Sequence, residues 1–387
     1  KTHFNMLLSY YERPLCVNCD WLSFSIKFDP MGVISLPSGL RAEKLNGTNV
    51  FRERWIIYNQ SGAKMMTICC NPYSPVLRDD IASCQVANPW LYNPDVNYLA
   101  SVFHGFKNAV FHGLSRWDVC CDFCPTDAEY KTIRKLTSGG QYVSGKSEGS
   151  MFWHSERYGN KDYRMAHCMS WGCATSALKI KLYNKSLEIN ATNRELCSKP
   201  YILDEWTNHL PDISKVWRLE FSWTDVNQLA INDKRLGFED ALSSDILVRF
   251  FSEVKAKRFI IRMNQGRREG HKNNDEIVPF LPFDMDKVTI RRAEPISCRE
   301  PLDEQRALAR HIWMHLSDRY VLCDDDRYNT MRNMLCDMAS DAVICGYLDS
   351  LCDGSFASWI ARLDDNRGLG IFDMINNDIE TSPMRER

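Results

Sequence analysis

Residues 114–123 read Leu-Ser-Arg-Trp-Asp-Val-Cys-Cys-Asp-Phe, and this stretch decides the fold class. Large apolar side chains alternate along it with polar ones, which is the pattern of a strand that buries one face. The polar face carries one arginine, two carboxylates and a thiol: Arg116, Asp118, Asp122 and Cys120. The stretch therefore predicts a sheet strand that presents reactive groups on one side.

Two further runs repeat this division between an apolar and a polar face. Residues 179–185 place Ile180 and Leu182 opposite a basic face with one tyrosine: Lys179, Lys181, Tyr183 and Lys185. Residues 217–223 set four large apolar side chains against Arg218, Glu220 and Ser222. A sheet built from the three runs would bury one surface beneath helices and present the other as a site.

The wider pattern predicts an α+β fold. Alternation dominates residues 20–225, and helical stretches are expected at 127–136, 200–209 and 238–254. Beyond Pro295 and Pro301 the pattern becomes helical. We therefore expect two domains, with 1–295 holding the chemistry and 296–387 forming an acidic helical domain for partner contact or dimerisation.

Composition is that of a globular protein. Of 387 residues, 44% are hydrophobic and 25% are charged, which excludes a largely disordered chain. No apolar run is long enough to span a bilayer, so we expect a soluble, cytoplasmic protein without a membrane partner. The sixteen cysteines fit buried free thiols. A zinc site made by Cys16, Cys19, Cys121 and Cys124 remains the alternative.

Charge is segregated along the chain. The net charge of −2 argues against indiscriminate nucleic-acid binding, but residues 255–272 carry seven cations and one acid. Those cations are Lys255, Lys257, Arg258, Arg262, Arg267, Arg268 and Lys272. From residue 301 onward there are nine arginines and sixteen acids. The basic segment predicts a phosphate-binding surface, with an ordinary solvated face as the alternative.

The polar sheet face is equipped for phosphoryl transfer. Carboxylates bind Mg²⁺ or Mn²⁺ as oxygen ligands, and such a cation polarises a scissile phosphate. A tyrosine hydroxyl with a pKa near 10 needs a metal or nearby cations to act as a nucleophile at neutral pH. We expect Lys181 and Lys185 to depress the pKa of Tyr183. The alternative is a solvated face of charged cross-strand pairs.

Four motifs in order carry a family resemblance. They are the run Asp20-Trp-Leu-Ser, the strand from Arg116 to Asp122, the run Leu182-Tyr-Asn-Lys-Ser-Leu-Glu188 and the run Val216-Trp-Arg-Leu-Glu220-Phe. Over residues 18–285 their order and spacing resemble the replication initiation factor family of rolling-circle plasmids, the Rep_trans group, which includes related relaxases of conjugative elements. The resemblance implies a rearranged HUH-like nuclease core, in which a largely antiparallel sheet carries helices on one face.

The resemblance also implies roles for individual residues. Tyr183 corresponds to the nucleophile, Asp118 and Glu220 to the metal ligands, and Asp122 to a third ligand. Lys185, Arg116 and Arg218 would contact phosphate or hold the carboxylates in position, and Lys179 and Lys181 would bind DNA. Position 184 is Asn where the family often has Asp.

The implied activity is that of a metal-dependent, site-specific single-strand endonuclease and strand transferase. The tyrosine would form a 5′-phosphotyrosyl bond, free a 3′-OH and later rejoin the strand, with origin DNA bound as a single strand or hairpin. A helicase and a second copy of the chain are further expected partners, in a bacterial host of a plasmid, phage or mobile element. A relaxase or transposon-type nuclease with the same chemistry, and a non-cutting DNA-binding regulator, are the alternatives.

Overall fold

The structure is a computed structural model, and it describes two compact units of the chain. The described residues are 14–28, 36–73, 80–92, 96–145, 148–158, 161–173, 176–224, 226, 229–266, 275–281 and 290–292. Unit 1 takes those within 1–24, 86–100 and 113–295, and unit 2 takes those within 25–85 and 101–112. The predicted helical domain of 296–387 lies outside the described residues, as do Arg267, Arg268 and Lys272.

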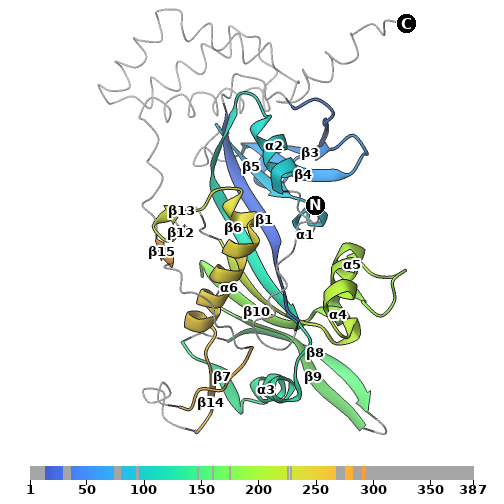
Figure 1. Cartoon of the computed structure of the whole chain (residues 1–387), viewed down its shortest axis with the longest axis vertical. Helices are drawn as coiled ribbons and strands as arrows, with labels where there is room; N and C mark the ends of the chain where they lie inside the picture. The colour runs from blue at the N-terminus through green and yellow to red at the C-terminus, as the bar shows by residue number, and fades with distance from the viewer. Residues whose placement is uncertain are drawn as a thin grey trace, which may run out of the picture. The chain divides into compact units, whose positions relative to one another are not determined.

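A sheet with the strand order β1-β6-β11-β10-β9-β8 forms the centre of unit 1 (Figure 1). Its strands are β1 (Cys16–Phe28), β6 (Ala109–Phe123), β11 (Trp217–Trp223), β10 (Leu178–Asn184), β9 (Lys161–Trp171) and β8 (Glu148–Tyr158), of which β1 and β6 continue into unit 2. The pairs from β6 through β8 are antiparallel. The prediction of an α+β fold with a largely antiparallel sheet is confirmed.

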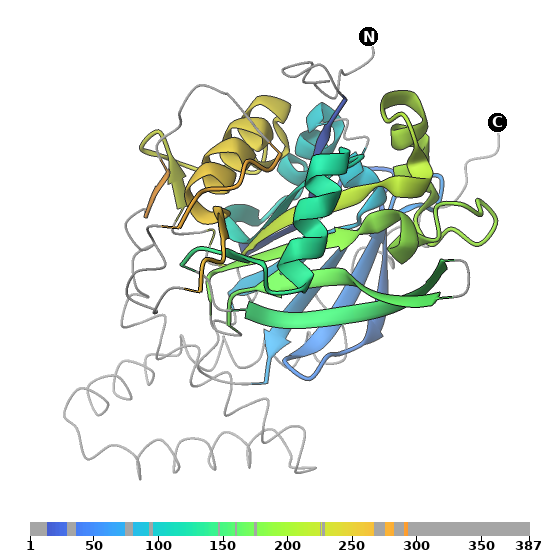
Figure 2. The same ribbon diagram turned by 90° about the horizontal axis from the view of Figure 1, so that it is seen from below.

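Helix α6 (Ser244–Arg258) covers the apolar face of this sheet. The ring of Phe250 lies 4.5 Å from that of Trp117 on β6, and the ring of Phe251 lies 5.0 Å from that of Phe221 on β11. Figure 2 shows the helix against the sheet. A 3-10 turn, Asp240–Leu242, precedes α6, so the helix begins later than the sequence pattern predicts. The polar face lies on the other side, where Trp206 of α5 (Pro200–His209) contacts Asp122 of β6. Helices therefore lie on both faces of the sheet, and the expectation of helices on one face is wrong.

Local signals fix the other helices of unit 1. Thr126 and Glu129 form a capping box at the start of α3 (Asp127–Thr137), a device worth about 1 kcal/mol. Pro200 opens α5 (Pro200–His209), where its missing N–H costs nothing. The remaining elements are α1 (Pro89–Tyr92), α2 (Val96–His104), which continues into unit 2, α4 (Lys185–Ile189), η1 (Ile213–Lys215), β7 (Gln141–Val143), β12 (Leu229–Ile231), β13 (Lys234–Arg235), β14 (Ile261–Met263) and β15 (Ile290–Arg292).

Unit 2 contains a sheet of its own strands beside β1. In the order β2-β3-β4-β5-β1 these are β2 (Arg41–Asn46), β3 (Phe51–Tyr58), β4 (Lys64–Pro72) and β5 (Ile81–Val86). Its inward side chains are apolar and buried: Trp55, Ile57, Met66, Ile68, Ala82 and Cys84. Gly62 adopts a φ of +78° in the turn between β3 and β4, a conformation that favours glycine. The alternating outward side chains of β3 are half-buried.

The structure also tests the predictions for Lys185, for the cysteines and for membrane-spanning segments. Lys185 does not continue strand β10 but is the first residue of α4, so the expected strand ends one residue earlier. The cysteines of the described residues are free thiols, and the four proposed zinc ligands are not among any group suited to a metal ion there. No helix of the described residues is long and apolar enough to cross a membrane.

Candidate functional site

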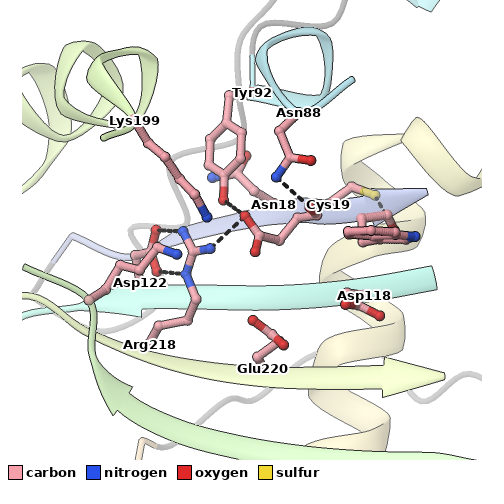
Figure 3. Close-up of polar contacts among 12 residues, drawn as sticks. Asn18, Cys19, Asn88, Tyr92, Asp118, Asp122, Lys199, Arg218 and Glu220 are labelled. Atoms are coloured by element: carbon pink, nitrogen blue, oxygen red, sulfur yellow. Dashed lines mark hydrogen bonds and ion pairs between the residues drawn. The ribbon is translucent and has the colours of Figure 1, made fainter. Parts of the chain in front are cut away.

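The predicted polar face of β6, β10 and β11 exists, and most of it is buried. Figure 3 shows four of its side chains, Asp118, Asp122, Arg218 and Glu220. The antiparallel register pairs Tyr183 with Arg218 and Lys181 with Glu220. On the other side of β11, Arg218 pairs with Asp122. The three strands therefore bring the tyrosine, the carboxylates and the cations onto one surface, as their alternation predicts.

The hydroxyl of Tyr183 lies between a carboxylate and an ammonium group. It donates a hydrogen bond of 2.9 Å to Oε2 of Glu220, and Nζ of Lys185 donates one of 3.3 Å to it. The other carboxylate oxygen of Glu220 accepts from Nζ of Lys181 at 3.1 Å. Both tyrosine and glutamate are buried, whereas the side chain of Lys181 keeps 40% exposure.

The electrostatics of Tyr183 correct one prediction. Burial raises the pKa of its hydroxyl well above the ordinary value, and the negative charge of Glu220 raises it further. Lys181 does not offset this effect because it forms an ion pair with Glu220. Burial also lowers the pKa of Lys185 itself. The expectation that the two lysines depress the pKa of Tyr183 is wrong for the protein alone, and its hydroxyl is protonated.

A strand-to-helix junction positions Lys185. Asn184 ends β10 and caps α4, its side chain accepting from the backbone N–H of Leu187 at 2.9 Å. Lys185 follows with 1% exposure and forms a 2.6 Å ion pair with Glu188 one turn later. Asn and Asp are equally good caps, so either residue at position 184 can serve this role. The motif is thus a strand end joined to a helix start.

Asp118 is a second buried carboxylate on the same face. Arg116 donates to both its oxygens, at 3.0 and 2.6 Å, and stacks 4.4 Å above the ring of Trp21. Burial raises the pKa of Asp118, and the nearby charge of Glu220 raises it further although Arg116 opposes both effects. Figure 3 shows the carboxylates of Asp118 and Glu220 on neighbouring strands. Two like charges held together in this way would be stabilised by a cation.

Asp122 and Arg218 belong to a separate buried network. Arg218 is fully buried and binds Asp122 through two contacts of 2.5 and 2.6 Å, while its Nη1 lies 2.7 Å from Asp20. Nε1 of Trp206 donates to Asp122 at 2.9 Å, and the hydroxyl of Tyr92 donates to Asp20. Asp122 and its partner Arg218 are both fully buried, whereas Asp118 and Glu220 pair with the partly exposed cations Arg116 and Lys181. Of the two roles considered for Arg218, holding carboxylates fits this burial, whereas phosphate contact does not.

Sequence reasoning missed several members of this network. Asp20 opens one of the four motifs, so a signal for it was present, although no role was assigned. Tyr92 on α1 and Trp206 on α5 come from elements with no chemical pattern. Lys199 was also missed; its Nζ lies 3.6 Å from Glu188, beside Lys185. These residues reach the site through tertiary packing, which spacing along one strand cannot indicate.

The described carboxylates offer two ligands for a metal rather than three. Within the described residues, no group of three or more His, Cys, Asp or Glu side chains is arranged to hold a metal ion. Asp118 and Glu220 remain the candidate pair, because the charge of Glu220 raises the pKa of Asp118. The expected third ligand, Asp122, lies in the network of Arg218.

The predicted basic segment is only partly an open surface. Burial lowers the pKa of Lys255 to about 8, and Lys257 pairs with Glu253. Arg262 donates to the backbone oxygen of Asp275 at 2.5 Å, whereas Arg258 is exposed. Lys179 is half-buried on β10. The part of this segment that the structure describes therefore contains fewer free cations than its composition suggests.

Comparison with solved structures gives a distant likeness. No protein-family model matches the sequence, and no curated protein matches it. Among solved structures, the chain is similar to one titled "Structure of Rolling Circle Replication Initiator Protein from Geobacillus stearothermophilus". The sequences are 13% identical, the TM-score is 0.40, and the match covers 69% of this chain and 93% of that chain. Assignment of a function at this distance depends on the site itself.

Proposed function

We propose that this chain cuts and rejoins one strand of DNA through Tyr183, as a rolling-circle replication initiator of the Rep_trans type. The observation that carries the proposal is the hydroxyl of Tyr183 between Glu220 and Lys185, on a sheet face that also holds Asp118. A buried tyrosine with a hydrogen-bonded base and an adjacent cation is the arrangement expected of an activated nucleophile.

The proposed reaction is a transesterification. The oxygen of Tyr183 attacks the scissile phosphorus while its proton passes to Glu220, 2.9 Å away. The bond from phosphorus to the 3′ oxygen breaks, and that oxygen takes up a proton to become a free 3′-OH. The 5′ phosphate stays on the tyrosine until a 3′-OH attacks it in reverse. One ester bond forms for each one broken, so no nucleotide cofactor is consumed.

The cations of the face divide by exposure. The side chains of Lys181 and Arg116 retain 40% and 35% exposure, so they are the ones that would meet a phosphate. Lys185 is buried against the hydroxyl, where a positive charge favours the phenolate that develops during attack. Arg218 forms ion pairs with Asp20 and Asp122. It would therefore hold these carboxylates in position rather than contact DNA.

Asp118 and Glu220 would hold one Mg²⁺ or Mn²⁺. The donor set fits, because Mg²⁺ at phosphoryl-transfer sites is bound by one or two carboxylates together with water and substrate phosphate. The raised pKa of Asp118, caused by burial and by Glu220, is the behaviour expected of two carboxylates arranged for a cation. When bound, such a cation would supply the positive charge that neutralises the phosphate. Asp122 is a weaker ligand candidate.

Wider features of the activity are part of the same proposal. Origin DNA, presented as a single strand or hairpin, would be the substrate, with a helicase and a second copy of the chain as partners in a bacterial cytoplasm. A relaxase or transposon-type nuclease would use the same chemistry. A non-cutting DNA-binding regulator is the competing function, and it is favoured by the raised pKa of the buried Tyr183 hydroxyl.

Covalent trapping tests the proposal. The full chain is incubated with Mg²⁺ or Mn²⁺ and a library of single-stranded oligonucleotides, and the attached peptide is identified by mass spectrometry. We expect an adduct on Tyr183 that disappears in Tyr183→Phe and persists in the control Tyr130→Phe, which alters a solvent-exposed tyrosine on α3. An adduct on another residue would refute the mechanism. Sequence-specific binding without an adduct under either cation would establish the regulator instead.

A further inference from the structure

Unit 2 carries a second charged sheet surface, separate from the site of Tyr183. We call it the outer face of unit 2 and define it by Arg41, Arg52, Arg54, Tyr58, Thr67 and Tyr73. The register pairs Arg41 with Tyr58, so the two point to the same side of the sheet. All six side chains are half-buried or exposed, whereas the alternate residues Trp55 and Ile57 are fully buried.

Two arginines on this face lie over tyrosine rings. Cζ of Arg41 is 4.5 Å from the ring centroid of Tyr58, and Cζ of Arg52 is 4.7 Å from that of Tyr73. The two stacks lie on different strands, because Arg41 is on β2 and Arg52 is near the start of β3. Guanidinium and tyrosine planes of this kind can each stack on a base.

Arg54 lies between the two stacks on β3. It forms no ion pair within the part of the chain that the structure describes, and its neighbour in the register is Cys69. The face also carries Glu43, which approaches Arg41 at 3.3 Å with both side chains well exposed, so that pair contributes little. The outer face of unit 2 is therefore positive and interleaved with aromatic rings.

We propose that the outer face of unit 2 binds single-stranded DNA. Cations that track a phosphate backbone, combined with aromatic or guanidinium planes that stack on bases, are the chemistry of single-strand recognition. A duplex keeps its bases stacked inside and could not use the two stacks. Arg52 and Arg54 would contact phosphate, and the pairs Arg41–Tyr58 and Arg52–Tyr73 would receive bases. The identification of the polymer as DNA rests on the proposed function. The charge and aromatic content of the surface are independent of it.

Salt-dependent binding separates the contributions of charge and stacking. The full chain is titrated with a twelve-residue oligothymidylate in the absence of divalent cations, and affinity is followed by fluorescence anisotropy across salt concentrations. Arg52→Gln with Arg54→Gln should reduce the log–log salt slope by about 1.4, since each single-strand phosphate contact contributes about 0.7. Tyr58→Leu with Tyr73→Leu should weaken binding about tenfold while leaving the slope unchanged.

A charge-matched control completes the test. Arg194→Gln with Lys215→Gln removes the same charge from exposed ion pairs of unit 1 and should leave both affinity and slope unaltered. Arginine variants that behave like this control would overturn the proposal. Loss of binding in the arginine variant with no effect of the tyrosine variant would also overturn it, because an acidic polypeptide, including the chain from residue 301 onward, would use charge alone.

A second readout keeps this inference distinct from the proposed function. An oligonucleotide bearing 5-bromodeoxyuridine should photocross-link to peptides that contain Tyr58 or Tyr73. Cross-linking there would support the surface whether or not an adduct forms on Tyr183 in the library assay with Mg²⁺ or Mn²⁺, and the lack of an adduct in that assay would refute the nuclease alone. An adduct on Tyr183 with cross-links only elsewhere would refute the surface and leave the nuclease standing.

Discussion

The polar face of unit 1 and the outer face of unit 2 are both built from alternating strands that carry arginines and tyrosines, yet they differ in burial. Arg218 in unit 1 is fully buried and binds two carboxylates, whereas Arg41 in unit 2 is 59% exposed and lies on a tyrosine ring. The same sequence pattern thus yields two kinds of surface. Burial by elements from elsewhere in the chain decides which one forms.

The difference matters because charge interactions are stronger away from water. In unit 1 the hydroxyl of Tyr183 and the carboxylate of Glu220 are held at one distance by buried partners, which suits a reaction that needs fixed geometry. On the outer face of unit 2, solvent screens Arg41, so this arginine can exchange partners along a flexible polymer. Four predictions would break or sharpen this contrast.

The largest effect is expected at the two carboxylates of the buried face. Glu220→Gln or Asp118→Asn should lower the cleavage rate roughly a thousandfold, because lost charge stabilisation of about 4 kcal/mol corresponds to that factor. Cleavage is measured by gel assay at saturating Mn²⁺, and DNA affinity should persist. The control Glu195→Gln makes the same change at an exposed glutamate of unit 1 outside both faces and should leave cleavage intact. Full activity in both buried variants would refute their role.

The next effect concerns stability. Arg218→Met leaves Asp20 and Asp122 buried without their common partner, which should cost about 3–5 kcal/mol in the free energy of unfolding. Arg54→Met on the outer face of unit 2 should change it by less than about 0.5 kcal/mol. Urea denaturation followed by circular dichroism measures both. Equal losses would mean that burial does not distinguish the two faces.

Lys185 should separate activity from stability. Lys185→Met removes the cation beside the Tyr183 hydroxyl, and we expect cleavage to fall about a hundredfold. The fold should be unaffected or stabilised, because burial lowers the pKa of this lysine and its charge is therefore costly to keep inside. Parallel urea titrations and cleavage assays test this. A variant that loses activity only because it unfolds would contradict the assignment.

The smallest effect is expected at Lys255, whose burial lowers its pKa to about 8. The unfolded chain keeps this proton up to a pH of about 10.4, so it binds more protons than the folded chain between those values. Stability of the wild type relative to Lys255→Met should therefore rise across that window, by on the order of 1 kcal/mol after allowance for solvent screening. Thermal unfolding at pH 7 and pH 10 measures the difference, and a constant difference would contradict it.

The sequence predicts much of the sheet. Alternation places residues 217–223 on a strand with the bounds that β11 shows, and Pro200 marks the start of α5. It also predicts that Tyr183, Glu220 and Asp118 share one face, because side-chain direction alternates strictly along a strand. These are local properties, which a single sequence carries.

The remainder depends on contacts between distant segments. Period-two alternation cannot show that Arg218 reaches Asp20, or that Tyr92 and Trp206 close the network around it. Nor does it give the depth of burial, which reverses the expected effect on the pKa of Tyr183. The division of residues 1–295 into two units likewise has no marker in composition.

One consequence follows from the position of β10 inside its sheet. Strand β10 is hydrogen-bonded to β11 on one side and to β9 on the other, and Tyr183 is its penultimate residue. In the proposed covalent complex, tension on the attached DNA strand would pass through this tyrosine into two antiparallel ladders at once. Both ladders share the load, and the attachment point is an interior strand rather than an edge that could peel away. The fold would then act as a mechanical anchor for the DNA end that it holds.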